Sequence, residues 1–281
     1  GYFSHIDPVT MRPDSPSLDK TDNREKKNWN SIGDHIPAYL VNLLLSIDPI
    51  PKSESVALAS GEVDVTKFWT NLRTLCRSIL NDCVDNIINH FPDDSSDFVY
   101  ERFQRDWKPD LSWGWQQDCG IVGHNLKISW NLTRCGHYYT RIVESIDKFE
   151  KSGDKHELHE NRKDYVEKAK KCYQLSQENG NKMKGVGVDL IRGGIFDALE
   201  RNPKNGMPTE FVWGSTKDFW QQEQAILAYY IMHGISDQQE TEFLELARYC
   251  AAFWNLFFID QDNRKIFFRT TESGEPVIES G

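Results

Sequence analysis

His124 is the residue whose type and surroundings most clearly suggest chemistry. It follows Gly123 where the pattern predicts the beginning of a helix, and Lys127, Asn131 and Arg134 follow it on one helical face. Histidine both gives and takes protons near neutral pH because its ordinary pKa is about 6.5. This polar row therefore indicates either the wall of a cavity or a solvent-exposed face that ends at a histidine.

Two further groups have residue types that suit a binding site. Asn30 and His35 lie at the beginning of an earlier predicted helix. Trp220 and Gln224 are four residues apart, so that one helical face would present an aromatic plane and an amide together. A core tryptophan beside a solvated glutamine explains the same spacing equally well.

Composition and charge narrow the class of protein. The 281 residues have a net charge of −10 and no basic stripe, which argues against a nucleic-acid partner. No run of about 18 apolar residues predicts a membrane span. The six cysteines lack any metal-ligand spacing, so we expect no metal site and interpret them as reduced thiols of a cytoplasmic protein.

Hydrophobic periodicity predicts the elements that would position these residues. Residues 1–7 alternate like a strand, and 8–27 are rich in Pro, Asp, Ser and Lys, which predicts a mobile loop. Asp34 is the expected N-cap of the first helix, and Gly180 is expected to end the fourth. The predicted helices cover 28–47, 64–91, 122–149, 156–179, 217–234 and 237–258, and short β segments or hairpins cover 96–115, 193–214 and 257–271.

Pairs of long helices separated by short β segments indicate an all-α fold of the α/α toroid type. We expect one domain over residues 1–281, with β-hairpins at one rim of the toroid. A closed (α/α)6 barrel has about twelve helices, and the pattern predicts six. The sequence therefore predicts an incomplete barrel, and both ends of the chain are typical of cuts within a longer protein.

Several motifs, in order along nearly the whole chain, resemble the N-acylglucosamine 2-epimerase family, which includes cellobiose epimerases and aldose–ketose isomerases. "GHNLKISW" resembles the signature GH-x-hydrophobic-E-x-x-W of this family, with His124 and Trp130 at the matching positions. The stretches that are similar to other family motifs are "GYFSHID…KKNWNSIGDHIPAYL", "YERFQRDWKP", "GVDLIRGGIFDAL" and "KDFWQQEQAILAY".

The resemblance implies an (α/α)6 barrel whose central cavity binds a small-molecule sugar without a cofactor. It implies that a base removes the proton α to the carbonyl of an open-chain sugar, giving an enediolate that an acid reprotonates. The family uses two histidines for this work. His124 matches one of them, and His35 matches a residue that holds a sugar oxygen. Further substrate contacts would come from Asn30, Lys127, Trp130, Trp220 and Gln224.

This chain departs from the family pattern at three carboxylates. Lys127, Pro37 and Gln224 stand where the family has glutamates, and the second catalytic histidine would lie beyond the last residue. Lys127 would stabilise the negative charge of an enediolate if it lies beside the substrate oxygen. The alternatives are a catalytically inactive carbohydrate-binding or interaction domain and, with less support, a six-hairpin glycoside hydrolase, which needs two facing carboxylates. A homodimer is a candidate assembly.

Overall fold

The computed structural model describes residues 2–48, 56–58, 61–63, 65–113, 118–153, 156–203, 210–212, 214–235 and 241–278, without the side chains of residues 30–31, 56–58 and 61–63. Its α-helices are α1 (Ile36–Ile47), α2 (Val65–His90), α4 (Val122–Lys151), α5 (Arg162–Val186), α6 (Phe219–His233) and α7 (Glu242–Phe253). Two π-helical segments, η2 (Asn30–His35) and η5 (Trp254–Phe258), and two 3-10 turns, η1 (Pro16–Thr21) and η3 (His159–Asn161), complete the helical part.

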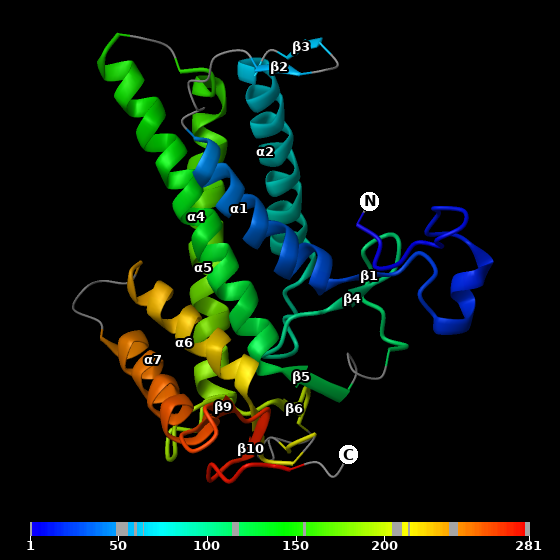
Figure 1. Cartoon of the computed structure of the whole chain (residues 1–281), viewed down its shortest axis with the longest axis vertical. Coiled ribbons are helices and arrows are strands. Elements are labelled where there is room, and N and C mark those ends of the chain that lie inside the picture. The colour runs from blue at the N-terminus through cyan, green and yellow to red at the C-terminus, as the bar shows by residue number, and fades with distance from the viewer. Residues whose placement is uncertain are drawn as a thin grey trace.

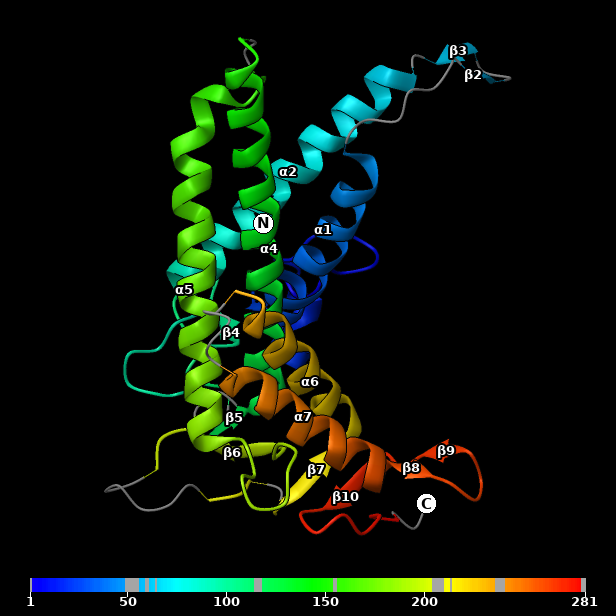
Figure 2. The same cartoon turned by 90° about the vertical axis from the view of Figure 1, so that its left-hand side faces the viewer.

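Within these residues the six α-helices form three pairs, and α4, a member of one pair, also contacts the other two (Figures 1 and 2). The helix α4 packs along α5 and also contacts α1 and α6, while α1 pairs with α2 and α6 with α7. One hydrophobic core joins α1 and α2 to residues 128–146 of α4 and residues 165–175 of α5. A second core joins the first part of α4, residues 122–130, to α6 and α7. The predicted all-α architecture of paired helices is confirmed.

The burial pattern of the long helices explains why they form where the sequence predicts them. In α2 the buried positions Cys76, Leu80, Cys83, Val84 and Ile87 recur every three or four residues, which places them on one face. The helix α4 has buried residues on several faces instead, because α1, α5, α6 and η2 all pack against it. α2 and α4 therefore begin and end within two residues of their predicted bounds.

Short antiparallel strand pairs connect the helices. The strands are β1 (Lys27–Asn28), β2 (Val56–Leu58), β3 (Gly61–Val63), β4 (Arg102–Phe103), β5 (Cys119–Ile121), β6 (Ala198–Glu200), β7 (Thr216–Asp218), β8 (Ile259–Asp260), β9 (Lys265–Ile266) and β10 (Arg269–Thr271). The hairpin in 257–271 is confirmed as β8–β9. The segments 96–115 and 193–214 also turn back on themselves, as predicted, through antiparallel bridges of Phe103 with Pro109 and of Leu199 with Phe211. In addition β4 pairs with β1 and β6 with β5, and local periodicity does not reveal these distant partners.

Two local predictions were wrong, for identifiable reasons. The described part of residues 1–7 contains no strand, because the Asp7 carboxylate accepts the backbone N–H groups of Val9 and Thr10 and turns the chain. Gly180 does not end α5, which continues to Val186. Gly180 is instead a packing residue, since a Cβ there would lie 2.6 Å from the terminal methyl group of Met232 on α6.

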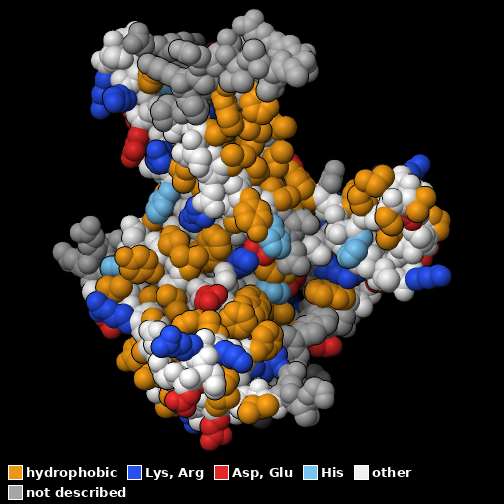
Figure 3. All heavy atoms as spheres, viewed as in Figure 1, with side chains coloured by type: hydrophobic (Ala, Val, Ile, Leu, Met, Phe, Trp, Pro, Cys, Tyr) orange, Lys and Arg blue, Asp and Glu red, His pale blue; other side chains and the backbone are white. Residues whose placement is uncertain are grey.

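Exposed hydrophobic side chains occur over much of the molecule, and several of them lie on α1. Tyr39, Leu43 and Leu45 are exposed on this helix, and Figure 3 shows hydrophobic side chains gathered over this region. Residues 8–27 contain turns and η1. Among the described residues, no helix combines the length with the apolar character that crossing a membrane requires.

Candidate active site

The pairing of β1 with β4 brings two distant segments against the beginning of α4. Lys27 lies opposite Phe103 and Asn28 opposite Arg102, and the ladder continues one residue further, where the Trp29 N–H donates to the Glu101 carbonyl at 2.8 Å. The side chains of Trp29 and Glu101 are both buried and both contact His124. The candidate site is thus assembled by strand pairing as well as by the helix.

His124 forms a histidine–carboxylate pair with Glu101. The Nδ1 atom of His124 lies 2.8 Å from Oε2 of Glu101, and the two side chains are 15% and 9% exposed. A carboxylate only accepts hydrogen bonds, so Nδ1 carries a proton and its N–H group donates a hydrogen bond to Glu101. In the neutral imidazole Nε2 then keeps its lone pair, which is the arrangement that a general base requires.

Two indole rings fix the plane of this imidazole. The Trp29 and His124 ring centroids are 3.9 Å apart, and the Trp220 centroid, from the first turn of α6, is 5.4 Å from that of His124. Contacts with two large rings restrict the rotation of the histidine about its side-chain bonds. The structure therefore brings Trp220 and His124 together, as the sequence reasoning expected for residues of one site.

Lys127 is held by a carboxylate that the sequence had assigned to another role. Its Nζ atom lies 2.7 Å from Oδ1 of Asp34, and Oδ2 of Asp34 lies 3.5 Å from Nε2 of His35. Asp34 was predicted as the N-cap of the first helix, which was wrong: it lies inside η2, and α1 begins after His35 without a side-chain cap. Its carboxylate instead lies 6% exposed between the lysine and the histidine.

The remaining predicted residues of α4 and α6 also contact one another. The Trp130 Nε1–H donates to Oε1 of Gln224 at 2.9 Å, and the Arg134 guanidinium lies 5.8 Å from the Trp130 ring. The buried Asn131 donates to the Gly33 and Asp34 carbonyl groups. The polar row on α4 is therefore not a solvent-exposed face: it packs against η2 and α6. The predicted residue Asn30 lies outside the described side chains.

The buried carboxyl group of Asp197 supports the beginning of α4 through Gln221. The Gly123 N–H donates to Oε1 of Gln221 at 2.8 Å, so that a side chain of α6 takes the role of a helix cap. A Cβ at position 123 would lie 2.7 Å from Cγ of Gln221, and hence glycine is required. The Gln221 amide in turn donates to Oδ1 of Asp197 at 3.4 Å. Asp197 thus bears indirectly on the position of His124.

Asp197 is a buried carboxyl group that faces a second carboxylate. Its side chain is fully buried, Thr216 donates to its Oδ2 at 2.8 Å, and Asp218 lies beside it with Arg269 bridging the two. Burial, followed by the charge of Asp218, raises the pKa of Asp197 to about 7. The group therefore holds a proton in the folded chain at pH values where an unfolded chain would lose it.

Asp197→Asn is expected to flatten part of the pH dependence of stability. Below the ordinary value of 3.8 both states are protonated, and between 3.8 and about 7 only the unfolded state ionises, so that Asp197 makes the wild type progressively less stable as pH rises. The upper limit of this effect is on the order of 4 kcal/mol. Urea unfolding at pH 4.5 and pH 7.5 gives the change in the free energy of unfolding between the two pH values. The effect is the difference in this change between the wild type and Asp197→Asn.

The exposed residue Asp118 supplies the control for this prediction. Asp118→Asn makes the same substitution outside the buried carboxyl pair and should leave the difference between the two pH values as in the wild type. An Asp197→Asn chain that loses as much stability as the wild type between these pH values would contradict the assignment.

The sequence reasoning missed Glu101, Trp29 and the role of Asp34. Glu101 and Asp34 place two carboxylates beside the predicted residues of α4, and each pairs with one of them, Glu101 with His124 and Asp34 with Lys127. Figure 3 shows acidic, basic and histidine side chains together where η2, α1 and α4 meet. No group of three metal-ligating side chains occurs among the described residues.

Comparisons with known proteins give structural rather than sequence relatives. No family model and no curated protein matches the sequence. The fold is similar to a sugar epimerase from a ruminal bacterium, with a TM-score of 0.59 and 13% identity over 97% of this chain and 53% of that one. It is also similar to a cellobiose 2-epimerase from Bacillus thermoamylovorans, with a TM-score of 0.50 and 13% identity over 90% of this chain and 66% of that one.

These likenesses concern the fold. They confirm the predicted all-α toroid arrangement of helices. The chain spans about half the length of the first epimerase and about two thirds of the second. The paired helices α1–α2, α4–α5 and α6–α7 thus have the arrangement that part of a sugar-epimerase fold adopts.

Proposed function

We propose that the chain carries the acid–base site of a sugar epimerase or aldose–ketose isomerase, with His124 as the group that exchanges the proton. Nε2 takes the proton from the carbon α to the carbonyl of an open-chain sugar, leaving an enediolate. Return of a proton to the opposite face of that carbon gives the epimer, and return to the neighbouring carbon gives the isomer. The observation that carries the proposal is the 2.8 Å contact of Nδ1 with Glu101.

The surroundings of His124 suit a sugar better than a large apolar ligand. Trp220, which is partly exposed, supplies an aromatic face beside the imidazole, and sugar rings stack on such faces through their C–H groups. Half-exposed His35 connects the cluster to solvent. In this proposal the substrate contacts come from Asn30, His35, Lys127, Trp130, Trp220 and Gln224.

A second candidate function is sugar binding without turnover. The observation that favours it is the Lys127–Asp34 ion pair, which puts a neutralised lysine where the family motif has a carboxylate. The two functions differ in one measurable property. An aldose incubated with the protein in D2O exchanges its C2 proton if His124 acts as a base, whereas binding with no exchange supports the second candidate.

Lys127→Met is expected to slow this exchange by about 100-fold, with a smaller change in KM. The ammonium group of Lys127 pairs with Asp34 in this cluster, and in this proposal it polarises the sugar oxygen on which charge develops. Initial rates of C2 exchange measure the effect. Lys170→Met, at an exposed position on α5, is the control and should behave as the wild type.

If Lys127→Met lowers kcat/KM only by as much as it lowers the affinity for the sugar, with kcat unchanged, the lysine only binds the substrate. An unchanged rate would remove Lys127 from the site. Far-UV circular dichroism and the unfolding temperature should accompany both variants, because Asp34 is 6% exposed and loses its nearest cation in the methionine variant.

A further inference from the structure

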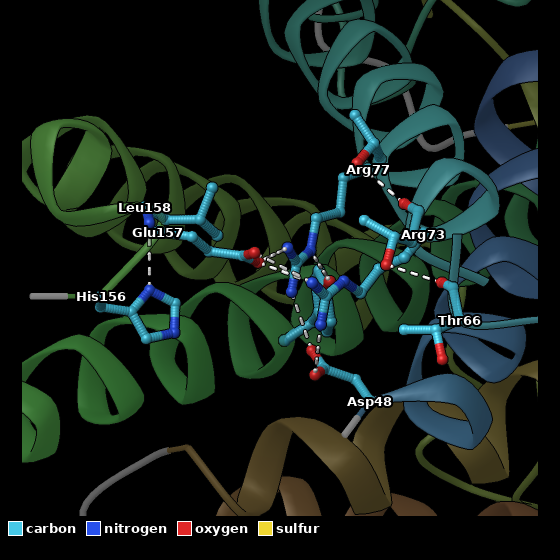
Figure 4. A network of polar contacts seen from close by, with 10 residues as sticks. Asp48, Thr66, Arg73, Arg77, His156, Glu157 and Leu158 are labelled. Carbon is cyan, nitrogen blue, oxygen red and sulfur yellow. Dashed lines mark hydrogen bonds and ion pairs between the residues drawn. The ribbon is translucent and has the colours of Figure 1, made fainter. Parts of the chain in front are cut away.

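A hollow lies toward the C-terminal end of α4, away from His124. Its volume is about 210 Å³, and α1, α2, α4 and the segment before η3 enclose it (Figure 4). Its charged lining consists of Asp48, Arg73, Arg77, Arg141, His156 and Glu157. Arg141 follows His124 by 17 residues on α4, which corresponds to about 25 Å along the helix axis. This hollow is therefore distinct from the proposed active site.

Two arginines one turn apart on α2 hold a pair of carboxylates. Arg77 donates to Glu157 and to Asp48, both at 2.9 Å, and its Nε–H donates to the Tyr138 hydroxyl at 2.9 Å. Arg73 donates to both Glu157 oxygens at 2.9 and 3.0 Å. Figure 4 shows the two guanidinium groups directed to the same carboxylates. Glu157 thus occupies the fork that the guanidinium groups of Arg73 and Arg77 form, as a bound carboxylate ligand would.

The lining has more positive than negative charge. Three guanidinium groups face two carboxylates, and within the described part of the chain Arg141 has no ion pair, while Nε of Arg73 is buried without a hydrogen-bond partner. Glu157 is the more accessible of the two carboxylates, at 49% exposure against 31% for Asp48. If Glu157 leaves the fork for solvent, three cations face one carboxylate, an excess of two positive charges.

We propose that this hollow binds a phosphate group, either inorganic phosphate or a small phosphate monoester, in the place that Glu157 occupies. A phosphate dianion matches the excess charge, and its oxygens accept the parallel N–H pairs that arginine presents. The hollow is smaller than the range of about 300–1,000 Å³ typical of drug-sized ligands, so the ligand is small. Glu157 is an internal competitor for this anion, and Arg141 is the cation that the ligand recruits.

Two substitutions with opposite expected effects test this assignment in the whole chain. Inorganic phosphate and glycerol phosphate are titrated separately by calorimetry, at an ionic strength held constant with chloride. Arg141→Gln is expected to weaken phosphate binding about tenfold, by removing a charge-assisted contact. Glu157→Gln is expected to strengthen it about tenfold, by removing the competing charge. Arg248→Gln, at an exposed arginine on α7, should change neither.

The results separate the two sources of the phosphate group and can reject the proposal. Tighter binding of glycerol phosphate supports a phosphorylated metabolite as the ligand, and tighter binding of inorganic phosphate supports the free anion. Heats that match those of chloride alone would overturn the proposal, as would equal binding by the wild type, Arg141→Gln and Glu157→Gln. Sugar exchange by Arg141→Gln should remain at the wild-type level, since this arginine lies far from His124.

Discussion

Replacing His124 by alanine is expected to abolish exchange of the sugar C2 proton with solvent. The imidazole is the group whose Nε2 lone pair the Glu101 contact leaves available, and a positioned general base contributes about 10²- to 10⁴-fold to such a reaction. The loss should appear in kcat, with KM changed less, because Trp220 remains to contact the sugar. Proton NMR of an aldose in D2O measures the rate.

His159 supplies a matched control. It forms the same type of pair, with Glu150, but on the surface and away from the candidate site. His159→Ala should therefore exchange like the wild type. Because the His124 ring packs against two indoles, His124→Gln should be measured beside His124→Ala to separate lost chemistry from lost packing. Wild-type exchange rates in both folded His124 variants would remove the histidine from the mechanism.

Glu101→Gln is expected to lower the exchange rate by about 100-fold while the chain stays folded. A glutamine can present its N–H groups to Nδ1, which shifts the imidazole proton to Nε2 and blocks the base. It also removes the negative charge that stabilises the imidazolium formed when His124 takes a proton. The signature of such a positioning role is a changed pH profile of kcat with little change in KM.

The glutamate prediction has its own control and rescue. Glu150→Gln makes the same change in the surface pair and should leave the exchange rate unchanged. Glu101→Asp keeps the charge on a shorter side chain and should recover part of the rate that the glutamine variant loses. A Glu101→Gln enzyme with an unaltered pH profile would reduce Glu101 to a packing residue.

Local sequence patterns were sufficient for the helices but not for the contacts that surround His124. The spacing of apolar residues in α2 and α4 fixes those helices because it depends only on residues three and four apart. Glu101 reaches His124 only because β1 pairs with β4, across more than 70 residues of sequence. No periodicity encodes that register, so the carboxylate beside the histidine was not predicted.

Two single residues show the same limit. Gly180 has the residue type of a helix end, yet α5 continues because the missing side chain makes room for Met232. Asp34 has the residue type of an N-cap, yet its carboxylate binds Lys127 from another helix. In both cases a tertiary contact, absent from the local sequence, outweighs the local preference. Motif spacing did place His124, Trp130, Trp220 and Gln224 in one neighbourhood, as the resemblance implied.

The most direct measurement is incorporation of deuterium at C2 of aldoses incubated with the protein in D2O, followed by mass spectrometry and NMR over a panel that includes glucose, mannose and cellobiose. The proposal predicts substrate-dependent, enzyme-catalysed incorporation that His124→Ala eliminates and His159→Ala preserves. Sugar binding detected by calorimetry without any deuterium incorporation across the panel would contradict the acid–base role of His124.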